Sequence, residues 1–313
     1  MKAIDLHSDT ILRLSENPCE TLKSATGHIS LDKLIKGDVT CQCFALFTKM
    51  HELADDELSP FERLCSLHDI FVREVGSYEG VVIQAFSASD IAENEKKGII
   101  SALLTIEGLD ALEGKLENAE TVVSWGARIA GLTWNWENEL AYPQSEDESI
   151  MSAGLKPFGR EVIELFNEKG VIVDVSHLSD GGLWDVIGLA DKVVATHSNS
   201  RAVTPNNRNL TDEMIRSLAD KGGVVGLNFC SSFLTSDNSH ESRISDMVIH
   251  VKHLLNTGGE DILALGSDFD GIGGILEVDG PDKFPCLYEA LHQAGISHSV
   301  LEKMWKKNIL RLL

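Results

Sequence analysis

The sequence predicts a (β/α)8 barrel, in which eight parallel strands close into a cylinder surrounded by helices. Short apolar runs alternate with amphipathic helical stretches, which is the pattern of parallel strands joined by crossover helices. There are eight such runs, each nearly continuous in apolar residues, and 313 residues suffice for one barrel. A doubly wound open sheet is the alternative. That fold usually has a glycine-rich phosphate turn after its first strand, whereas this chain has His7-Ser8-Asp9-Thr10 there.

The predicted strands are, in order, Ala3–His7, Val39–Phe47, Ala102–Ile106, Ile129–Thr133, Val171–Val175, Val193–Thr196, Val224–Asn228 and Ile262–Gly266. Val81–Phe86 is predicted as a short extra strand. Apolar residues recur at helical spacing in Pro60–Val75, Phe158–Lys169, Asp212–Lys221, Arg243–Asn256 and a last helix that begins near Ser297. Asn135–Leu155 and Ile272–Pro285 are predicted loops. No repeat or proline-rich linker divides the chain, so residues 1–313 are predicted to form a single barrel domain.

The charge balance excludes some classes of partner. The chain has 27 Lys and Arg residues against 49 Asp and Glu residues, a net charge of −22. Nucleic acids and anionic membranes require a basic face, so neither is an expected partner. No apolar run approaches the roughly 18 residues of a membrane span, and no signal-peptide pattern is present. These features predict a cytoplasmic protein without a membrane anchor.

Polar side chains with metal-binding capacity recur where the predicted strands end. His7 ends the first strand and Asp9 comes just after it. Glu107 follows the third strand, His177 the fifth, His197 the sixth and Asp268 the eighth. Each one alone has a simpler interpretation; for example, Asp9 could cap a turn, and His7 could be an internally satisfied polar residue. In a barrel, however, the carboxyl ends of all strands meet at one rim, where active sites lie. Three imidazoles and several carboxylates there predict two divalent metal ions, most simply zinc, with Glu107 placed to bridge them.

These residues lie in motifs that resemble the membrane dipeptidase (renal dipeptidase) family of zinc peptidases. The motifs are Asp5-Leu6-His7-Ser8-Asp9, Glu107-Gly108, Ser176-His177, Thr196-His197-Ser198, Asn207-Arg208-Asn209-Leu210 and Gly266-Ser267-Asp268-Phe269-Asp270-Gly271. The similarity extends to the terminal Asn308-Ile309-Leu310-Arg311 and so covers essentially the whole chain. It implies a barrel with two Zn²⁺ ions that hydrolyses the amide bond of dipeptides by a hydroxide bridging the metals.

The resemblance also implies a role for each site residue. His7 and Asp9 would bind one zinc, His177 and His197 the other, and Glu107 both. Asp268 would hold the water and move its proton, and Arg208 would bind the carboxylate of the substrate. The simpler alternatives are a surface salt bridge for Arg208 and a structural role for Asp268, shared with Asp270. A homodimer is a further implication.

The sequence departs from the family pattern after the fourth strand. Some members have a histidine there that reaches the scissile carbonyl, whereas this chain has Trp134 followed by Asn135. An indole offers only an N–H donor and cannot transfer a proton near neutral pH. Trp134 and Asn135 are therefore predicted substrate-binding residues, and the substrate range is where this chain would differ. Two alternatives remain: a related barrel hydrolase acting on lactams, lactones or N-acyl amino acids, and a non-catalytic metal-binding protein.

Overall fold

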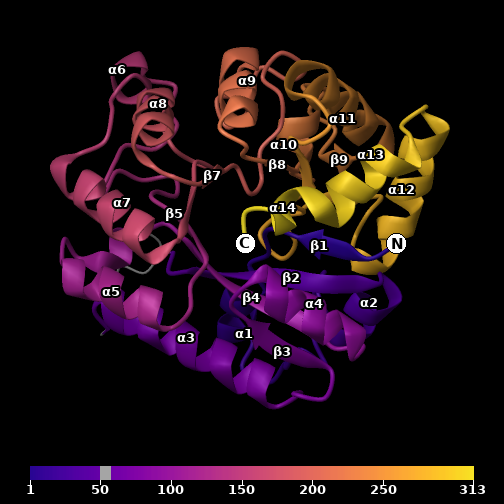
Figure 1. Cartoon of the computed structure of the whole chain (residues 1–313), viewed down its shortest axis with the longest axis horizontal. Coiled ribbons are helices and arrows are strands. Elements are labelled where there is room, and N and C mark those ends of the chain that lie inside the picture. The colour runs from indigo at the N-terminus through magenta and orange to yellow at the C-terminus, as the bar shows by residue number, and fades with distance from the viewer. Residues whose placement is uncertain (50–57) are drawn as a thin grey trace.

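The structure, a computed structural model, describes residues 1–49 and 58–313. Its central feature is a barrel of eight parallel strands, which confirms the predicted fold (Figure 1). The strands are β1 (Ala3–Asp5), β2 (Val39–Phe47), β4 (Ile100–Glu107), β5 (Ile129–Gly131), β6 (Ile172–Asp174), β7 (Val193–Val194), β8 (Val225–Leu227) and β10 (Leu263–Leu265). Several are shorter than predicted: β1 ends at Asp5, so His7 lies beyond the strand. β4 is longer and includes Glu107 as its last residue.

The strands follow the order β7-β6-β5-β4-β2-β1-β10-β8, and the contact of β7 with β8 closes the barrel. Closure is made by a single parallel bridge between Ala195 and Val225. Beside this seam the barrel is narrow, because Gly226 and Gly266 lie against the carbonyl oxygen of Thr196. A Cβ atom on either glycine would approach that oxygen to 1.9 or 1.8 Å, so only glycine fits at both positions.

The predicted extra strand is also present, as β3 (Val82–Ala85). It pairs with the amino-terminal half of β4, where Val82 lies opposite Ile100. The carboxyl-terminal half of β4 pairs instead with β5, where Thr105 lies opposite Ile129. The edge of β4 is therefore shared, and β3 stays outside the closed ring.

Helices surround the barrel (Figure 1). They are α1 (Thr10–Glu16), α2 (Leu31–Lys36), α3 (Pro60–Gly76), α4 (Ala88–Lys96), α5 (Leu116–Ser124), α6 (Glu148–Met151), α7 (Pro157–Lys169), α8 (Asp180–Leu189), α9 (Asp212–Asp220), α10 (Ser231–Leu234), α11 (Ile244–Gly258), α12 (Phe284–Gln293), α13 (His298–Glu302) and α14 (Asn308–Leu310). The two predicted loops are not free of regular structure. The first contains α6, and the second contains β11 (Ile275–Leu276), which pairs with β9 (Glu241–Ser242). Within the described ranges, no helix has both the length and the apolar content needed to cross a bilayer.

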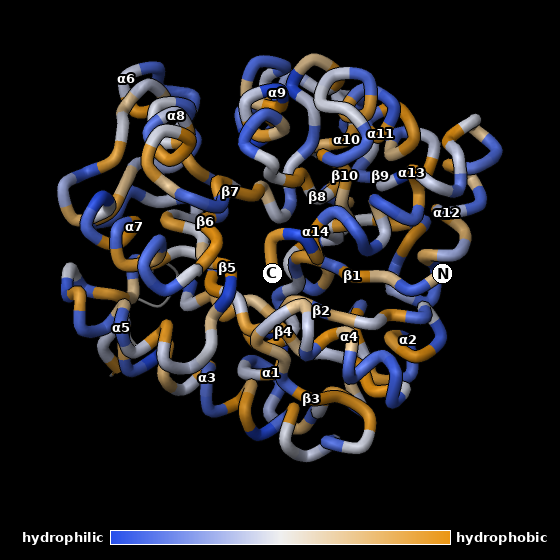
Figure 2. The backbone as a smooth tube through the Cα atoms, viewed as in Figure 1, coloured by the Kyte–Doolittle hydropathy of each residue, from blue (hydrophilic) through white to orange (hydrophobic). Residues whose placement is uncertain are grey.

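The chain buries two separate apolar cores. The larger lies between the strands and the surrounding helices, and the smaller fills the barrel interior with residues such as Ile4, Leu103 and Ile172. Ile309 and Leu312 of the C-terminal segment belong to the inner core, and Figure 2 shows this segment near the centre of the ring of strands. The apolar plug leaves the carboxyl-terminal rim as the place where polar side chains converge.

Candidate active site and metal centre

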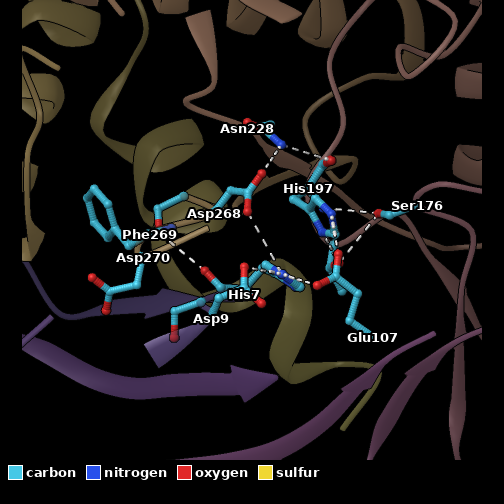
Figure 3. Close-up of polar contacts among 12 residues, drawn as sticks. His7, Asp9, Glu107, Ser176, His197, Asn228, Asp268, Phe269 and Asp270 are labelled. Atoms are coloured by element: carbon cyan, nitrogen blue, oxygen red, sulfur yellow. Dashed lines mark hydrogen bonds and ion pairs between the residues drawn. The ribbon is translucent and has the colours of Figure 1, made fainter. Parts of the chain in front are cut away.

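Six polar side chains predicted from the sequence come together at the carboxyl-terminal rim of the barrel. They are His7 and Asp9 after β1, Glu107 at the end of β4, His177 after β6, His197 after β7 and Asp268 after β10. Each is between 1% and 8% exposed. Figure 3 shows His7, Glu107 and His197 facing one another, with Asp9 and Asp268 beside them.

Glu107 lies at the centre of the cluster and faces two groups of ligand atoms. Its Oε1 is 2.9 Å from Nε2 of His177 and 3.4 Å from Nε2 of His197. Its Oε2 is 3.5 Å from Nε2 of His7. One carboxylate therefore spans the space between the histidine pair on one side and His7 on the other. This is the geometry expected of a residue that bridges two cations.

His7 and Asp9 form the second half of the cluster with Asp268. Nε2 of His7 is 3.5 Å from Oδ2 of Asp9 and 4.0 Å from Oδ1 of Asp268. Backbone hydrogen bonds fix the two segments together, because the amide of Asp9 donates to Phe269 and the amide of Asp268 donates to His7. Asp9 occupies the N-cap position of α1 but makes no capping hydrogen bond with its side chain. The turn-capping alternative for Asp9 is therefore wrong.

Hydrogen bonds at Nδ1 fix the orientation of His177 and His197, which lie on the other side of Glu107 from His7. Nδ1 of His177 is 2.8 Å from Oδ1 of Asn135, and Nδ1 of His197 is 2.8 Å from Oγ1 of Thr196. The Thr196 hydroxyl already donates its hydrogen to Asp174, so it accepts from His197. Both histidines thus carry their hydrogen on Nδ1 and turn a lone pair on Nε2 toward Glu107. Such partners of the distal nitrogen are typical of metal-binding histidines.

Burial governs the ionisation of the histidine pair. It lowers the pKa of His177 and of His197 well below the ordinary value, so both imidazoles are neutral. The neutral imidazole is the form that binds a metal. The two Nε2 atoms are only 2.9 Å apart, without a hydrogen between them. A cation that accepts both lone pairs removes this repulsion.

Burial and close neighbours also shift the pKa values of the carboxyl groups and of His7. Burial, with the neighbouring Asp9 carboxylate, raises the pKa of Glu107 to about 8, and burial raises the pKa of Asp268 to about 6. Burial alone would lower the pKa of His7, but the Glu107 and Asp9 carboxylates outweigh it and hold this pKa well above its ordinary value. Nε2 of His7 and Oδ1 of Asp9 are buried without a hydrogen-bond partner. Closely placed anions with unpartnered ligand atoms form a site whose charge a divalent cation would balance.

Gly271 keeps the approach to this second half open. A Cβ atom at this position would lie 2.0 Å from Oδ2 of Asp9 and 2.7 Å from Oδ1 of Asp268. The absence of a side chain therefore leaves space above two ligand oxygens. Together with the convergent imidazoles, this space gives a donor set that fits a divalent metal ion.

Strained backbone accompanies the site. His177, Asp268 and Asp270 adopt left-handed φ angles of 67°, 64° and 67°, which non-glycine residues rarely do. Asp270 is nevertheless not a second Asp268. Its oxygens accept hydrogen bonds from the Thr10 hydroxyl and the His28 backbone amide, so it fixes the loop. The two aspartates therefore have separate roles, and Asp268 alone faces the ligand cluster.

A cavity of about 420 Å³ opens above the cluster. Asp9, Glu107, His177 and Asp268 line its floor, and its walls include Leu12, Phe47, Trp134, Asn135, Cys230, Phe233 and Ile272. The ring of Trp134 lies 4.7 Å from that of Phe47 and 5.9 Å from that of His177. The predicted Trp134 thus forms an aromatic wall beside His177. Asn135 reaches the same cavity, but its side-chain oxygen is turned to His177.

Arg208 is buried beside the site, 6% exposed, and is not among the residues that line this cavity. Its Nη2 donates to the carbonyl of His197 at 3.4 Å, and its guanidinium lies 5.3 Å from the ring centre of Phe233. Among the residues described, no carboxylate lies within ion-pair distance of it, and its Nε has no hydrogen-bond partner. The surface salt bridge considered for Arg208 is therefore wrong. A buried guanidinium with unused donors is available to an anion.

The structure adds Asn228 and Asp174, which the sequence did not single out, and gives a role to Thr196 of the motif Thr196-His197-Ser198. Asn228, just after β8, donates from Nδ2 to Oδ2 of Asp268 at 2.8 Å. Asp174 and Thr196 orient His197 from below. Asn228 ends the predicted strand Val224–Asn228, so the rule that polar residues at strand ends are functional could have found it. Asp174 lies inside a predicted strand, where no such signal exists.

Fold and site together define a barrel hydrolase that uses bound metal. The chain belongs to the membrane dipeptidase family (peptidase family M19), whose profile matches residues 1–313. The predicted family is confirmed, and with it the activity class of a metal-dependent dipeptidase.

Several known proteins are similar to this chain. An uncharacterized protein of Klebsiella pneumoniae, named for the pqqA 5′ region, is 35% identical over 236 residues, 72% of this chain and 86% of its own length. The dipeptidase tcpJ of Claviceps purpurea is 27% identical over 299 residues, covering 93% of this chain and 70% of its own. A metallopeptidase of Rhodobacter sphaeroides, solved with a phosphinate mimic of the dipeptide L-Ala-D-Ala, is 26% identical. It superposes with a TM-score of 0.89 over 100% of this chain and 98% of that chain.

Proposed function

We propose that the protein cleaves the peptide bond of dipeptides with a free carboxylate, using two zinc ions at the carboxyl-terminal rim. One observation carries this proposal. Nε2 of His177, Nε2 of His197 and Oε1 of Glu107 converge within 3.4 Å of one another, while both Nδ1 hydrogens are engaged elsewhere. Two imidazole lone pairs without a hydrogen, facing each other beside a carboxyl group, favour a bound cation, and imidazole with carboxylate suits zinc.

His177 and His197 would hold one ion, His7 and Asp9 the other, and Glu107 both. Bound there, the metals would polarise the peptide carbonyl and make water available as a nucleophile near neutral pH. The Rhodobacter sphaeroides relative, solved with a dipeptide mimic, supports a dipeptide as the substrate.

The side chains of the chain supply the remaining steps. Asp268 presents Oδ1 to the ligand cluster, where it can take a proton from water and return it to the leaving nitrogen. Arg208 carries a buried positive charge beside Asp268 and Glu107, and we assign it to the substrate carboxylate. Phe47 and Trp134 form an apolar wall that excludes water and contacts a side chain of the dipeptide. Asn135 holds His177 and, through that contact, the first metal.

The organisation as a single barrel domain, the cytoplasmic location and the homodimer remain predictions. The first is supported by the C-terminal segment, because Ile309 and Leu312 pack inside the barrel that begins with β1.

The test is turnover of a panel of L,L and L,D dipeptides by zinc-loaded protein, with Glu107→Gln as the control. We expect cleavage by the wild type and its loss in the variant, with circular dichroism showing that the variant folds. Amidated dipeptides should be cleaved far more slowly; equal cleavage would make the role of Arg208 wrong. A protein that hydrolyses lactams, lactones or N-acyl amino acids but no dipeptide would overturn the proposed function.

A further inference from the structure

Asn228 connects the catalytic carboxylate to the rest of the rim. It follows β8 and is 0% exposed. Its Nδ2 donates to Oδ2 of Asp268 at 2.8 Å and to the carbonyl of His197 at 3.3 Å. Figure 3 shows the side chain of Asn228 between these two residues. One amide group therefore contacts both the proposed proton carrier and the backbone of a proposed metal ligand.

The backbone N–H of Cys230 fixes the orientation of the Asn228 side-chain amide. The backbone N–H of Cys230 lies 2.6 Å from Oδ1 of Asn228. A backbone N–H can only donate, so the oxygen of the amide must face Cys230. The NH₂ group consequently faces Asp268, and the amide cannot turn its oxygen there without placing an NH₂ group against the N–H of Cys230.

The backbone of Asn228 is held as firmly as its side chain. Its N–H donates to Oδ1 of Asn199 at 3.0 Å, and its carbonyl accepts from Nδ2 of Asn199 at 2.9 Å. Asn199 is also 0% exposed. Three neighbouring strand ends, those of β7, β8 and β10, are thus joined through Asn199, Asn228 and Asp268 in a single buried chain of hydrogen bonds.

We propose that Asn228 is a positioning residue of the reaction. It donates a hydrogen bond to Oδ2 of Asp268 and thereby leaves Oδ1 as the oxygen that carries the proton. This inference rests on the proposed function. Oδ1 is the atom that faces His7, and it lies beside the open space above Gly271. The proton taken from water at Oδ1 passes to the leaving nitrogen as the carbon–nitrogen bond breaks, and Asp268 returns to its starting state. A carboxylate with both oxygens free would rotate and lose this alignment.

The kinetic test compares Asn228→Ala and Asn228→Asp with the wild type. Asn228→Asp keeps the shape and the acceptor for Cys230 but replaces the donor at Asp268 with a second acceptor. For both variants we expect kcat to fall about 10- to 100-fold, the loss typical of removing such an outer partner. KM for the dipeptide should change less than about threefold, and the zinc content should stay that of the wild type.

Asn308→Ala is the matched control. Asn308 is 2% exposed and donates from Nδ2 to the carbonyls of Glu260 and Leu263, far from the rim. We expect it to lower Tm without changing kcat. If Asn228→Asp keeps the wild-type kcat, or if kcat falls only together with zinc content, the positioning role is overturned.

A second measurement does not depend on activity. Asn228→Ala, Asp268→Ala and the double variant are unfolded thermally without metal. Because the two side chains share a hydrogen bond, the double variant should shift Tm by less than the sum of the single shifts. Additive shifts would overturn the inference. If the wild type cleaves no dipeptide, the proposed function is overturned. The thermal cycle would still show whether the side chains of Asn228 and Asp268 interact.

Discussion

The Nε2 atoms of His177 and His197 lie 2.9 Å apart, and both imidazoles are held in the tautomer that leaves these atoms without hydrogen. Asn135 holds the first ring and Thr196 the second. Removing either partner frees a ring to rotate or to change tautomer. We therefore expect the metal affinity of the site to depend on residues that do not touch the metal.

Asn135→Ala should weaken zinc binding about 10- to 100-fold, because His177 loses the acceptor at Nδ1. Competition with a chromophoric chelator measures the affinity directly. The control is Asn118→Ala, which should bind zinc as the wild type does. Asn118 lies in the first turn of α5, and its side chain donates to the carbonyl of Leu112. In the wild type, zinc at 1,000 times its Kd should stabilise the fold by about 4 kcal/mol, and excess chelator should remove this gain. An Asn135→Ala protein with wild-type affinity would contradict the tautomer argument.

Gly271→Ala should abolish most activity, because the new Cβ would lie 2.0 Å from Oδ2 of Asp9. A displacement of about 1 Å at a reacting group costs on the order of 100-fold in rate. Gly273→Ala, two residues along the same loop, has nothing within 4 Å of its Cβ and is the matched control. Steady-state kinetics of both variants decide the matter. Equal rates would show that Asp9 adjusts freely and that the space above it is not needed.

Trp134→Ala should raise KM for dipeptides with large apolar side chains about tenfold, with little change for glycylglycine. The Trp134 and Phe47 rings lie 4.7 Å apart, and an aromatic contact contributes about 0.5–1.5 kcal/mol beyond the area it buries. Kinetics with a paired substrate panel make the comparison. Trp184→Ala, on the outer face of α8 and 38% exposed, should change neither KM. A uniform change across the panel would mean that Trp134 acts on the reaction and not on the side chain.

His250 should make stability depend on pH. It is fully buried, accepts from the amide of Ser200 and donates to the carbonyl of Leu234, and burial lowers its pKa from 6.5 to about 4. Above pH 6.5 the histidine is neutral in both the folded and the unfolded chain. As pH falls toward 4, only the unfolded chain gains the proton, so stability is lost in that window.

Between pH 7.5 and pH 5 this loss amounts to about 2 kcal/mol from His250 alone. Urea unfolding at both pH values, with zinc held saturating, measures it. His250→Gln should lose about that much less than the wild type over the same interval, whereas replacement of the exposed His240 by Gln should not alter the dependence. An unchanged pH dependence in His250→Gln would show that other groups carry it.

The fold class and the grouping of polar side chains at the rim could be predicted from the sequence because each depends on local pattern. Strands buried on both faces are mostly apolar, as Val39–Phe47 and Ile100–Glu107 are, and this pattern can be recognised without knowing which strands pair. In a barrel the carboxyl ends of all strands share one rim, so His7, Glu107 and His197 could be grouped before any contact was known. Helix α8 was not predicted, because its three glycines weaken the apolar periodicity from which helices were recognised.

Only the tertiary structure decided which atom of each residue is used. Asn228 meets Asp268 from 40 residues away, and Thr196 meets Asp174 from 22. Such partners are set by the register and closure of the barrel, which no local pattern encodes. The burial of Arg208 beside Phe233 is likewise a property of the packed loops. The sequence thus determined the chemical groups and the rim that collects them, while packing determined the tautomers, the free carboxylate oxygen and the walls of the cavity.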